Sequence, residues 1–298
     1  MVTQNVEILK PATTNQKTAM KSRSIITTLS AVALLLGVHS GVRADLAFSQ
    51  SVTSDIIFGS GNLNGNFTVD RNDAIGLELG LRARERYDSS GLPAPAGNGV
   101  PSSLTGDQGD SRYILDPANG NQPANRSYFN FDWSVNTDFN GNGTGQSADD
   151  FTYKLFIDYD PSAAVGSVVS FDPINLADAD HTFGDNGTGN GAGVVRTSPA
   201  EYQSFIADPT KNLVQQSWNL GFFGPSTTGF DDGDNIYTVW LEAYAGGAIV
   251  GKTYITVGPT LATPVIVPVP EPSSALLVSL ILSIGCFARR KKRAVVEA

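Results

Sequence analysis

The residues best suited to chemistry lie in an acidic, glycine-rich loop over residues 138–149. Counted from Asp138, oxygen-bearing side chains fall at positions 1, 3, 5, 9 and 12, and a glycine falls at position 6. This is the spacing of a Ca²⁺-binding loop, in which position 7 supplies a backbone carbonyl. The candidate metal ligands are Asp138, Asn140, Asn142, Thr144 and Asp149.

Two features of this loop leave a second interpretation open. Asp149 stands where such loops carry a longer, bidentate glutamate, and strands rather than helices are expected on both sides. The alternative is a glycine-asparagine turn that joins two strands and stays polar for solubility. Three other acidic loops, around residues 158–160, 178–185 and 231–234, allow the same two interpretations.

His181 is the only histidine after residue 44. Imidazole titrates near neutral pH, so His181 could act as a general base or a metal ligand; the alternative is an exposed loop histidine. The chain lacks the G-x-S-x-G, H-E-x-x-H and phosphate-loop motifs, and sequence cannot place any two of its glutamates about one cleft. We therefore expect a protein without catalytic activity.

Three tryptophans, Trp133, Trp218 and Trp240, could form a platform on which sugar rings stack. The alternative is that they anchor the core, because aromatic side chains bury the most area. Trp133 alternates in step with Phe129 and Phe131, which favours the core for that residue.

The elements that must position these residues read as strands. Period-2 alternation of apolar and polar residues is clearest over residues 128–136, where we expect one face in the core and the other in water. The predicted strands are 55–58, 66–70, 75–84, 128–136, 151–159, 213–223, 236–245 and 249–257. We expect 128–136 and 151–159 to pair as a hairpin, 236–245 to be a central strand, and Gly246-Gly247 to form a hairpin turn.

Polar loops are expected at residues 89–109 and 176–193, and a single short helix is expected to start after Ser198. Ser198 and Glu201 form a capping box, and Pro199 suits the first helical position. With no alternation of strands and helices, the pattern predicts a mainly β fold: a single antiparallel β-sandwich or jelly roll with one short helix.

Composition limits the partners of this domain, which we place at residues 45–263. Those residues include 26 acidic and 10 basic side chains, a net charge of −16, so nucleic acid is an unsuitable partner. The only cysteine of the chain, Cys286, lies outside the domain, which therefore has neither a disulfide nor a thiol nucleophile.

The first 44 residues read as a secretory signal peptide. Lys21 and Arg23 precede an apolar run over residues 25–38, and Val42-Arg43-Ala44 is an A-x-A-like end, so signal peptidase is expected to cleave after Ala44. Because the basic region begins at Met20, translation is expected to start there; a long N-terminal region is the alternative.

Residues 264–298 have three parts in order: a proline-rich stretch containing Pro270, Glu271 and Pro272, a 15-residue apolar run over 274–288, and a basic cluster. The prolines keep the first part extended, and cations directly after an apolar segment mark the cytoplasmic side. The basic cluster that fixes this orientation is Arg289, Arg290, Lys291, Lys292 and Arg293. A stop-transfer anchor without processing is the alternative.

This arrangement resembles the PEP-CTERM sorting signal of exported bacterial proteins. The body is also similar to PEP-CTERM proteins of unassigned function, through residues 75–82, 131–135 and 216–219. The signal peptide adds an expected N-terminal signal helix. The resemblance implies a C-terminal anchor helix that holds the precursor transiently in the inner membrane, and cleavage by an exosortase near Pro270, Glu271 and Pro272. It also implies release to the cell surface or the extracellular matrix.

We therefore expect an exported surface or matrix protein with a structural or interaction role. The alternatives are a carbohydrate-binding module or a Ca²⁺-stabilised adhesin in exopolysaccharide and, as a third class, a hydrolase.

Overall fold

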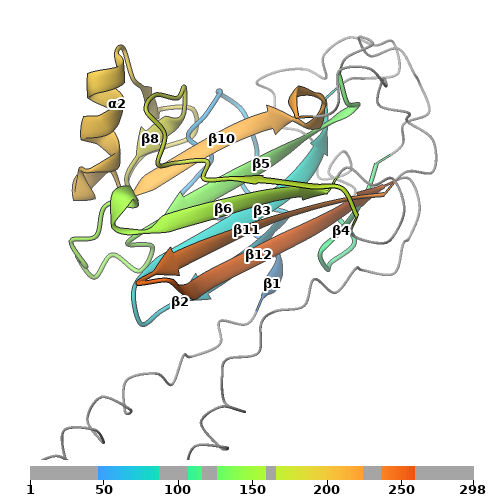
Figure 1. Ribbon diagram of the computed structural model, residues 1–298, viewed down its shortest axis with the longest axis horizontal. Coiled ribbons are helices and arrows are strands. Elements are labelled where there is room, and N and C mark those ends of the chain that lie inside the picture. The colour runs from blue at the N-terminus through green and yellow to red at the C-terminus, as the bar shows by residue number, and fades with distance from the viewer. Residues whose placement is uncertain (1–45, 87–106, 116–125, 159–165, 224–235, 259–298) are drawn as a thin grey trace, which may run out of the picture. The chain divides into compact units, whose positions relative to one another are not determined.

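The computed structural model describes residues 46–86, 107–115, 126–158, 166–223 and 236–258, all within one compact unit of the chain. In these residues twelve strands form two sheets, accompanied by one α-helix (Figure 1). The predicted mainly β fold with one short helix is confirmed. The predicted signal and anchor helices lie outside the described residues.

The larger sheet has seven strands in the order β1-β2-β3-β5-β10-β8-β9, and every neighbouring pair is antiparallel. The strands are β1 (Ala47–Gln50), β2 (Phe67–Asn72), β3 (Leu77–Glu85), β5 (Phe129–Asn136), β8 (Thr182–Gly184), β9 (Val194–Val195) and β10 (Leu213–Asn219). Two of these, β8 and β9, fall within or beside the predicted polar loop 176–193, where short strands interrupt the polar sequence.

The smaller sheet has five strands in the order β4-β12-β11-β6-β7. They are β4 (Arg112–Ile114), β6 (Thr152–Asp158), β7 (Val168–Phe171), β11 (Tyr237–Ala245) and β12 (Ala248–Gly258). The prediction that 236–245 is a central strand is confirmed, since β11 lies between β12 and β6. Strand β4 pairs with β12 in parallel, so the expectation of purely antiparallel pairing is wrong at that edge.

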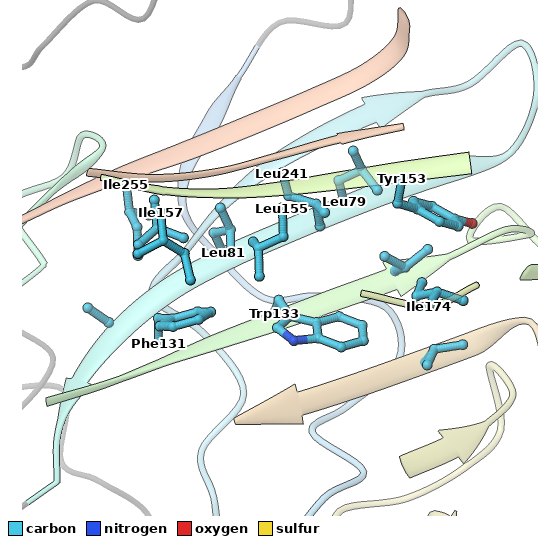
Figure 2. Packing of buried hydrophobic residues seen from close by; sticks show 14 of the residues in the cluster. Leu79, Leu81, Phe131, Trp133, Tyr153, Leu155, Ile157, Ile174, Leu241 and Ile255 are labelled. Carbon is cyan, nitrogen blue, oxygen red and sulfur yellow. The ribbon is translucent and has the colours of Figure 1, made fainter. Parts of the chain in front are cut away.

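The facing sides of the two sheets share one hydrophobic core, because each strand presents every second side chain to it. Figure 2 shows side chains of β3 and β5 near those of β6, β11 and β12. The labelled members from the first pair of strands are Leu79, Leu81, Phe131 and Trp133; those from the other three are Tyr153, Leu155, Ile157, Leu241 and Ile255. This burial supplies the main driving force for folding.

The predicted hairpin between 128–136 and 151–159 is wrong. Strand β5 pairs with β3 and β10, whereas β6 pairs with β11 and β7 in the other sheet. Both strands have an apolar face, and these faces meet across the core instead of lying side by side. The Gly246-Gly247 hairpin is confirmed: both glycines have positive φ and connect β11 to β12.

The helix α2 (Pro199–Ile206) begins where it was predicted, with Ser198 as N-cap and Pro199 in the first turn. The Ser198 hydroxyl accepts the Glu201 backbone N–H at 3.2 Å, but the Glu201 carboxylate accepts from Thr197 rather than from Ser198. In Figure 1 the helix lies beside β8. Three 3₁₀ turns complete the described helices: Ala148–Asp150, Pro209–Lys211 and Leu220–Phe222.

Candidate functional site

The side of β5 that faces away from the core is buried, so the expectation of a water-exposed face is wrong. Its four polar residues, Asn130, Asp132, Ser134 and Asn136, are all buried. Residues 51–66, which connect β1 to β2, lie against this side of the larger sheet; we call them the covering segment. Residues 55–58 belong to it and form no strand, contrary to the prediction.

The covering segment is attached to the sheet mainly by bonds between its backbone and polar side chains. Gln215 of β10 acts like a peptide group: its Oε1 accepts the Ile57 N–H at 2.9 Å, and its Nε2 donates to the Asp55 carbonyl at 2.9 Å. Asn136 Nδ2 donates to the Thr53 carbonyl at 2.9 Å. Since buried backbone groups need partners, these side chains determine where the segment lies.

Glu78 holds the beginning of the covering segment. Its carboxylate accepts the Thr53 N–H at 2.7 Å and the Arg71 Nε–H at 2.7 Å. Burial raises the pKa of Glu78, although the bonds from Thr53 and Arg71 oppose this shift. The apolar side chains of the segment form a small second core with β2, made of Val52, Ile56, Phe58, Phe67 and Val69.

The buried polar side chains between the larger sheet and the covering segment form what we call the polar layer. A charged triad of Asp132, Arg82 and Arg84 lies at its centre. Asp132 Oδ2 accepts from Arg82 Nε at 2.8 Å and from Arg84 Nε at 2.9 Å, and the Asp132 side chain is fully buried. Burial alone would raise the pKa of Asp132, but the charges of Arg84 and Arg82 hold the pKa below its usual value. Arg82 Nη1 also donates to the carbonyls of Leu63 and Gly65, which fixes the end of the covering segment.

The predicted calcium loop is well ordered by its own hydrogen bonds. The Asp138 carboxylate accepts the backbone N–H groups of Gly143 at 3.1 Å and Thr144 at 3.4 Å. Asn140 Oδ1 accepts the N–H of Asn142 at 3.2 Å, so the loop brings the first four candidate ligands together through side-chain to backbone bonds.

The fifth candidate ligand, Asp149, is engaged separately. Its Oδ1 accepts from the Ser147 hydroxyl at 2.6 Å within the 3₁₀ turn Ala148–Asp150. Among the described residues there is no group of three or more His, Cys, Asp or Glu side chains placed to hold a metal ion. These bonds are those of a polar turn, and calcium binding stays a prediction.

His181 is fully buried, so the interpretation as an exposed loop histidine is wrong. It lies between α2 and the core, with ring centroids 4.9 Å from Trp133 and 5.8 Å from Tyr202. Nε2 lies 2.6 Å from the Pro173 carbonyl and therefore carries the proton, while Nδ1 has no partner among the described residues. Burial lowers the pKa of His181, which favours the neutral imidazole in this aromatic surrounding.

The three tryptophans occupy different environments. Trp133 is fully buried, which confirms the core interpretation, and Trp218 packs against it with 5.5 Å between ring centroids. Trp240 is on the other side of the smaller sheet, stacked on Phe156 at 4.6 Å and opposite Tyr254 in register. The tryptophans therefore do not share one platform.

Polar groups on β11, β6 and β12 lie in register next to Trp240 and Phe156. Glu242 pairs with Lys252 (Nζ to Oε1, 2.9 Å) and accepts a short hydrogen bond from the Tyr244 hydroxyl. Partial burial and the Glu242 carboxylate raise the pKa of Tyr244. Lys154 lies over the Tyr244 ring, beside a hollow of about 480 Å³ between β6, β7 and the end of β11.

Sequence reasoning missed the polar layer. The pattern that could have indicated it is the arginine at every second position from Arg82 to Arg86, in a domain with few basic residues. Arginines at every second position, beside a strand that carries one central aspartate, are a pattern that can form a buried ion network. Nothing local, however, distinguishes a covered polar face from a hydrated one.

The predicted export and sorting residues all lie outside the described residues: Ala44, Pro270, Glu271, Pro272, Arg289, Arg290, Lys291, Lys292 and Arg293. In the part of the chain that is described, no helix has the length and apolar character required to cross a membrane.

Comparison with known proteins identifies no relative: no protein-family model, curated protein or solved structure matches this chain.

Proposed function

We propose that the chain is an exported surface or extracellular-matrix protein with a structural or interaction role and no catalytic activity. The observation that carries the proposal is the order of three parts in residues 264–298: Pro270-Glu271-Pro272, an apolar run and a basic cluster. Signal peptidase cleaves after Ala44, the apolar run holds the precursor in the inner membrane, and an exosortase frees it. The exported part is a β-sandwich in which every described strand pair except β4 with β12 is antiparallel, supported by two sheets with a common core.

Cell fractionation of the producing bacterium tests this proposal. The wild-type protein should reach the cell surface or the medium with a reduced mass and an N-terminus at Asp45. Glu271→Ala should remain in the inner membrane at the precursor mass, whereas Glu297→Ala, a matched change beyond the basic cluster, should behave as wild type. Normal release of the Glu271→Ala variant would exclude the sorting role.

Carbohydrate binding is a second candidate, favoured by the aromatic row of Phe156, Trp240 and Tyr254 on the smaller sheet. Sugar rings pack on aromatic faces, and Lys154 and Tyr244 beside the row offer polar groups. Because Trp240 is only 7% exposed, binding would rely mainly on its two neighbours. Neutral oligosaccharides should then bind to the wild type and lose affinity in Phe156→Ala, while Phe222→Ala, an exposed aromatic elsewhere, should bind normally.

A Ca²⁺-stabilised adhesin is the third candidate, and it depends on the Asp138 loop. Calcium would have to replace the bonds that the Asp138 carboxylate now makes to Gly143 and Thr144. Thermal unfolding in excess Ca²⁺ and in chelator decides the matter. At about 100 times the dissociation constant, a native-state ligand adds roughly 2.7 kcal/mol, which Asp138→Ala should abolish. Coincident unfolding curves would exclude the site.

A further inference from the structure

A hollow of about 420 Å³ opens at one end of the polar layer, between the larger sheet and the covering segment. Arg84, Arg86, Asn130 and Ser217 line it from the sheet, and Phe58 and Asn62 line it from the covering segment. This volume lies in the range of roughly 300–1,000 Å³ typical of small-molecule sites. The lining combines two cations with amide and hydroxyl groups.

Arg84 is held in place before any ligand arrives. Its Nε donates to both oxygens of Asp132, at 3.1 and 2.9 Å, and its Nη2 donates to the Ser217 hydroxyl at 3.1 Å. Its Nη1 makes no hydrogen bond with any described residue, and the side chain is 12% exposed. A guanidinium fixed in this way loses little freedom when it binds an anion.

The local charge is opposite to that of the domain. Asp132 is the only acidic partner that Arg82 and Arg84 contact in the described residues, and one carboxylate cannot neutralise two guanidinium groups. Arg86 lines the same hollow, and its backbone N–H is fixed by the Tyr128 carbonyl at 2.7 Å. Arg82, Arg84 and Asp132 together therefore carry one net positive charge beside the hollow, although residues 45–263 carry a net charge of −16.

The polar groups beside the arginines suit hydroxyl groups. Asn130 Nδ2 donates to Ser217 Oγ at 3.0 Å, and Asn130 Oδ1 accepts from Asn219 at 3.0 Å, so these side chains are rigid. Guanidinium groups recognise carboxylates through paired N–H donors. We propose that this hollow binds the carboxylate of a hydroxylated acid of sugar size, with Arg84 Nη1 on the carboxylate, Arg86 beside it and Asn130 near its hydroxyls.

Calorimetric titration of the full-length chain in neutral detergent tests this proposal, with galacturonate, galactose, acetate and trigalacturonate as the probes. Galacturonate should bind. Galactose lacks the carboxylate and acetate lacks the hydroxyl groups, so each should bind at least about tenfold more weakly. Arg86→Gln and Arg84→Gln should weaken galacturonate binding by about tenfold or more. Arg86→Gln keeps the test valid if Arg84→Gln fails to fold.

One control accompanies these variants. Arg196→Gln removes an arginine far along the sequence that pairs with Asp178, and this variant should bind galacturonate as wild type. The acid can be a unit of a polysaccharide or a free molecule, and trigalacturonate distinguishes the two. Binding equal to that of the monomer supports a uronate within a polysaccharide, and weaker binding supports a free acid.

The proposal is overturned if galacturonate does not bind, if galactose or acetate binds as tightly, or if Arg86→Gln has no effect. The proposed location at the cell surface is tested by fractionation, so either result can fail without the other.

Discussion

The two faces of the larger sheet are both closed to water along β5, but they are held in different ways. Toward the smaller sheet, Phe131, Trp133 and Val135 contribute apolar area. Toward the covering segment, Asp132, Ser134 and Asn136 of the same strand contribute hydrogen bonds and charge. The comparison shows that alternation in a strand places apolar side chains on one face and polar side chains on the other. It does not show whether the polar face contacts solvent.

The two interiors differ in how they respond to a change. In the apolar core, the free energy follows buried area and packing, so a smaller side chain leaves a cavity but no unmatched group. In the polar layer, removal of one partner leaves another partner buried without a bond, which costs the desolvation of that group. The polar layer should therefore tolerate fewer substitutions than its small size suggests.

The largest effect is expected from Asp132→Ala. This change leaves the buried guanidinium of Arg82 and the largely buried one of Arg84 without their counter-charge, and breaking such a network costs about 3–5 kcal/mol. Urea unfolding should show the loss as a lower midpoint. A loss below about 1 kcal/mol would mean that the triad behaves like a surface ion pair.

A smaller effect is expected from Gly193→Ala, which forces the covering segment off its support. A Cβ at residue 193 would lie 2.3 Å from Thr182 Cγ2 and 2.9 Å from the Ile57 carbonyl. Overpacking of this kind costs about 1–3 kcal/mol. Gly189→Ala is the matched control, because a Cβ there meets nothing within 4 Å and should leave the unfolding midpoint unchanged.

A pH-dependent effect is expected from His181, on the apolar side. Since its folded pKa is lowered, the unfolded state binds more protons as the pH falls below the ordinary value of about 6.5. Stability contributed by the neutral ring is thus complete above that pH and is lost below it, by at most about 1.4 kcal/mol per pH unit. In the His181→Phe variant, the free energy of unfolding should fall less between pH 7 and 5 than in the wild type. An equal fall in both proteins would contradict this assignment.

The smallest effect is expected from Arg196→Ala, which breaks a pair in contact with water. Arg196 Nε lies 2.6 Å from Asp178 Oδ1, and the two side chains are 29% and 33% exposed. Exposed pairs contribute about 0–1 kcal/mol, so urea unfolding should hardly change. A loss as large as that of Asp132→Ala would remove the distinction between covered and hydrated polar contacts.

Local chemistry made much of the fold predictable. Alternation identified β3, β5, β6 and β11, the capping residues located α2, and the glycine pair located the turn before β12. The short strands β8 and β9 were not predicted, because two or three residues are too few to show an alternating pattern. The sequence showed the spacing of the oxygen-bearing residues in the Asp138 loop. It did not show that the Asp138 carboxylate would accept the backbone N–H groups of Gly143 and Thr144.

The sequence by itself determined which side chains share a face, where the chain turns, and which parts of it are acidic, apolar or basic. These properties depend on residues a few positions apart. Only the tertiary structure decided that β5 and β6 belong to different sheets, that the covering segment lies over Asp132, and that His181 is buried beside Trp133. Each of these depends on contacts between residues far apart in the chain, and strand alternation is the same whichever partner or solvent lies opposite.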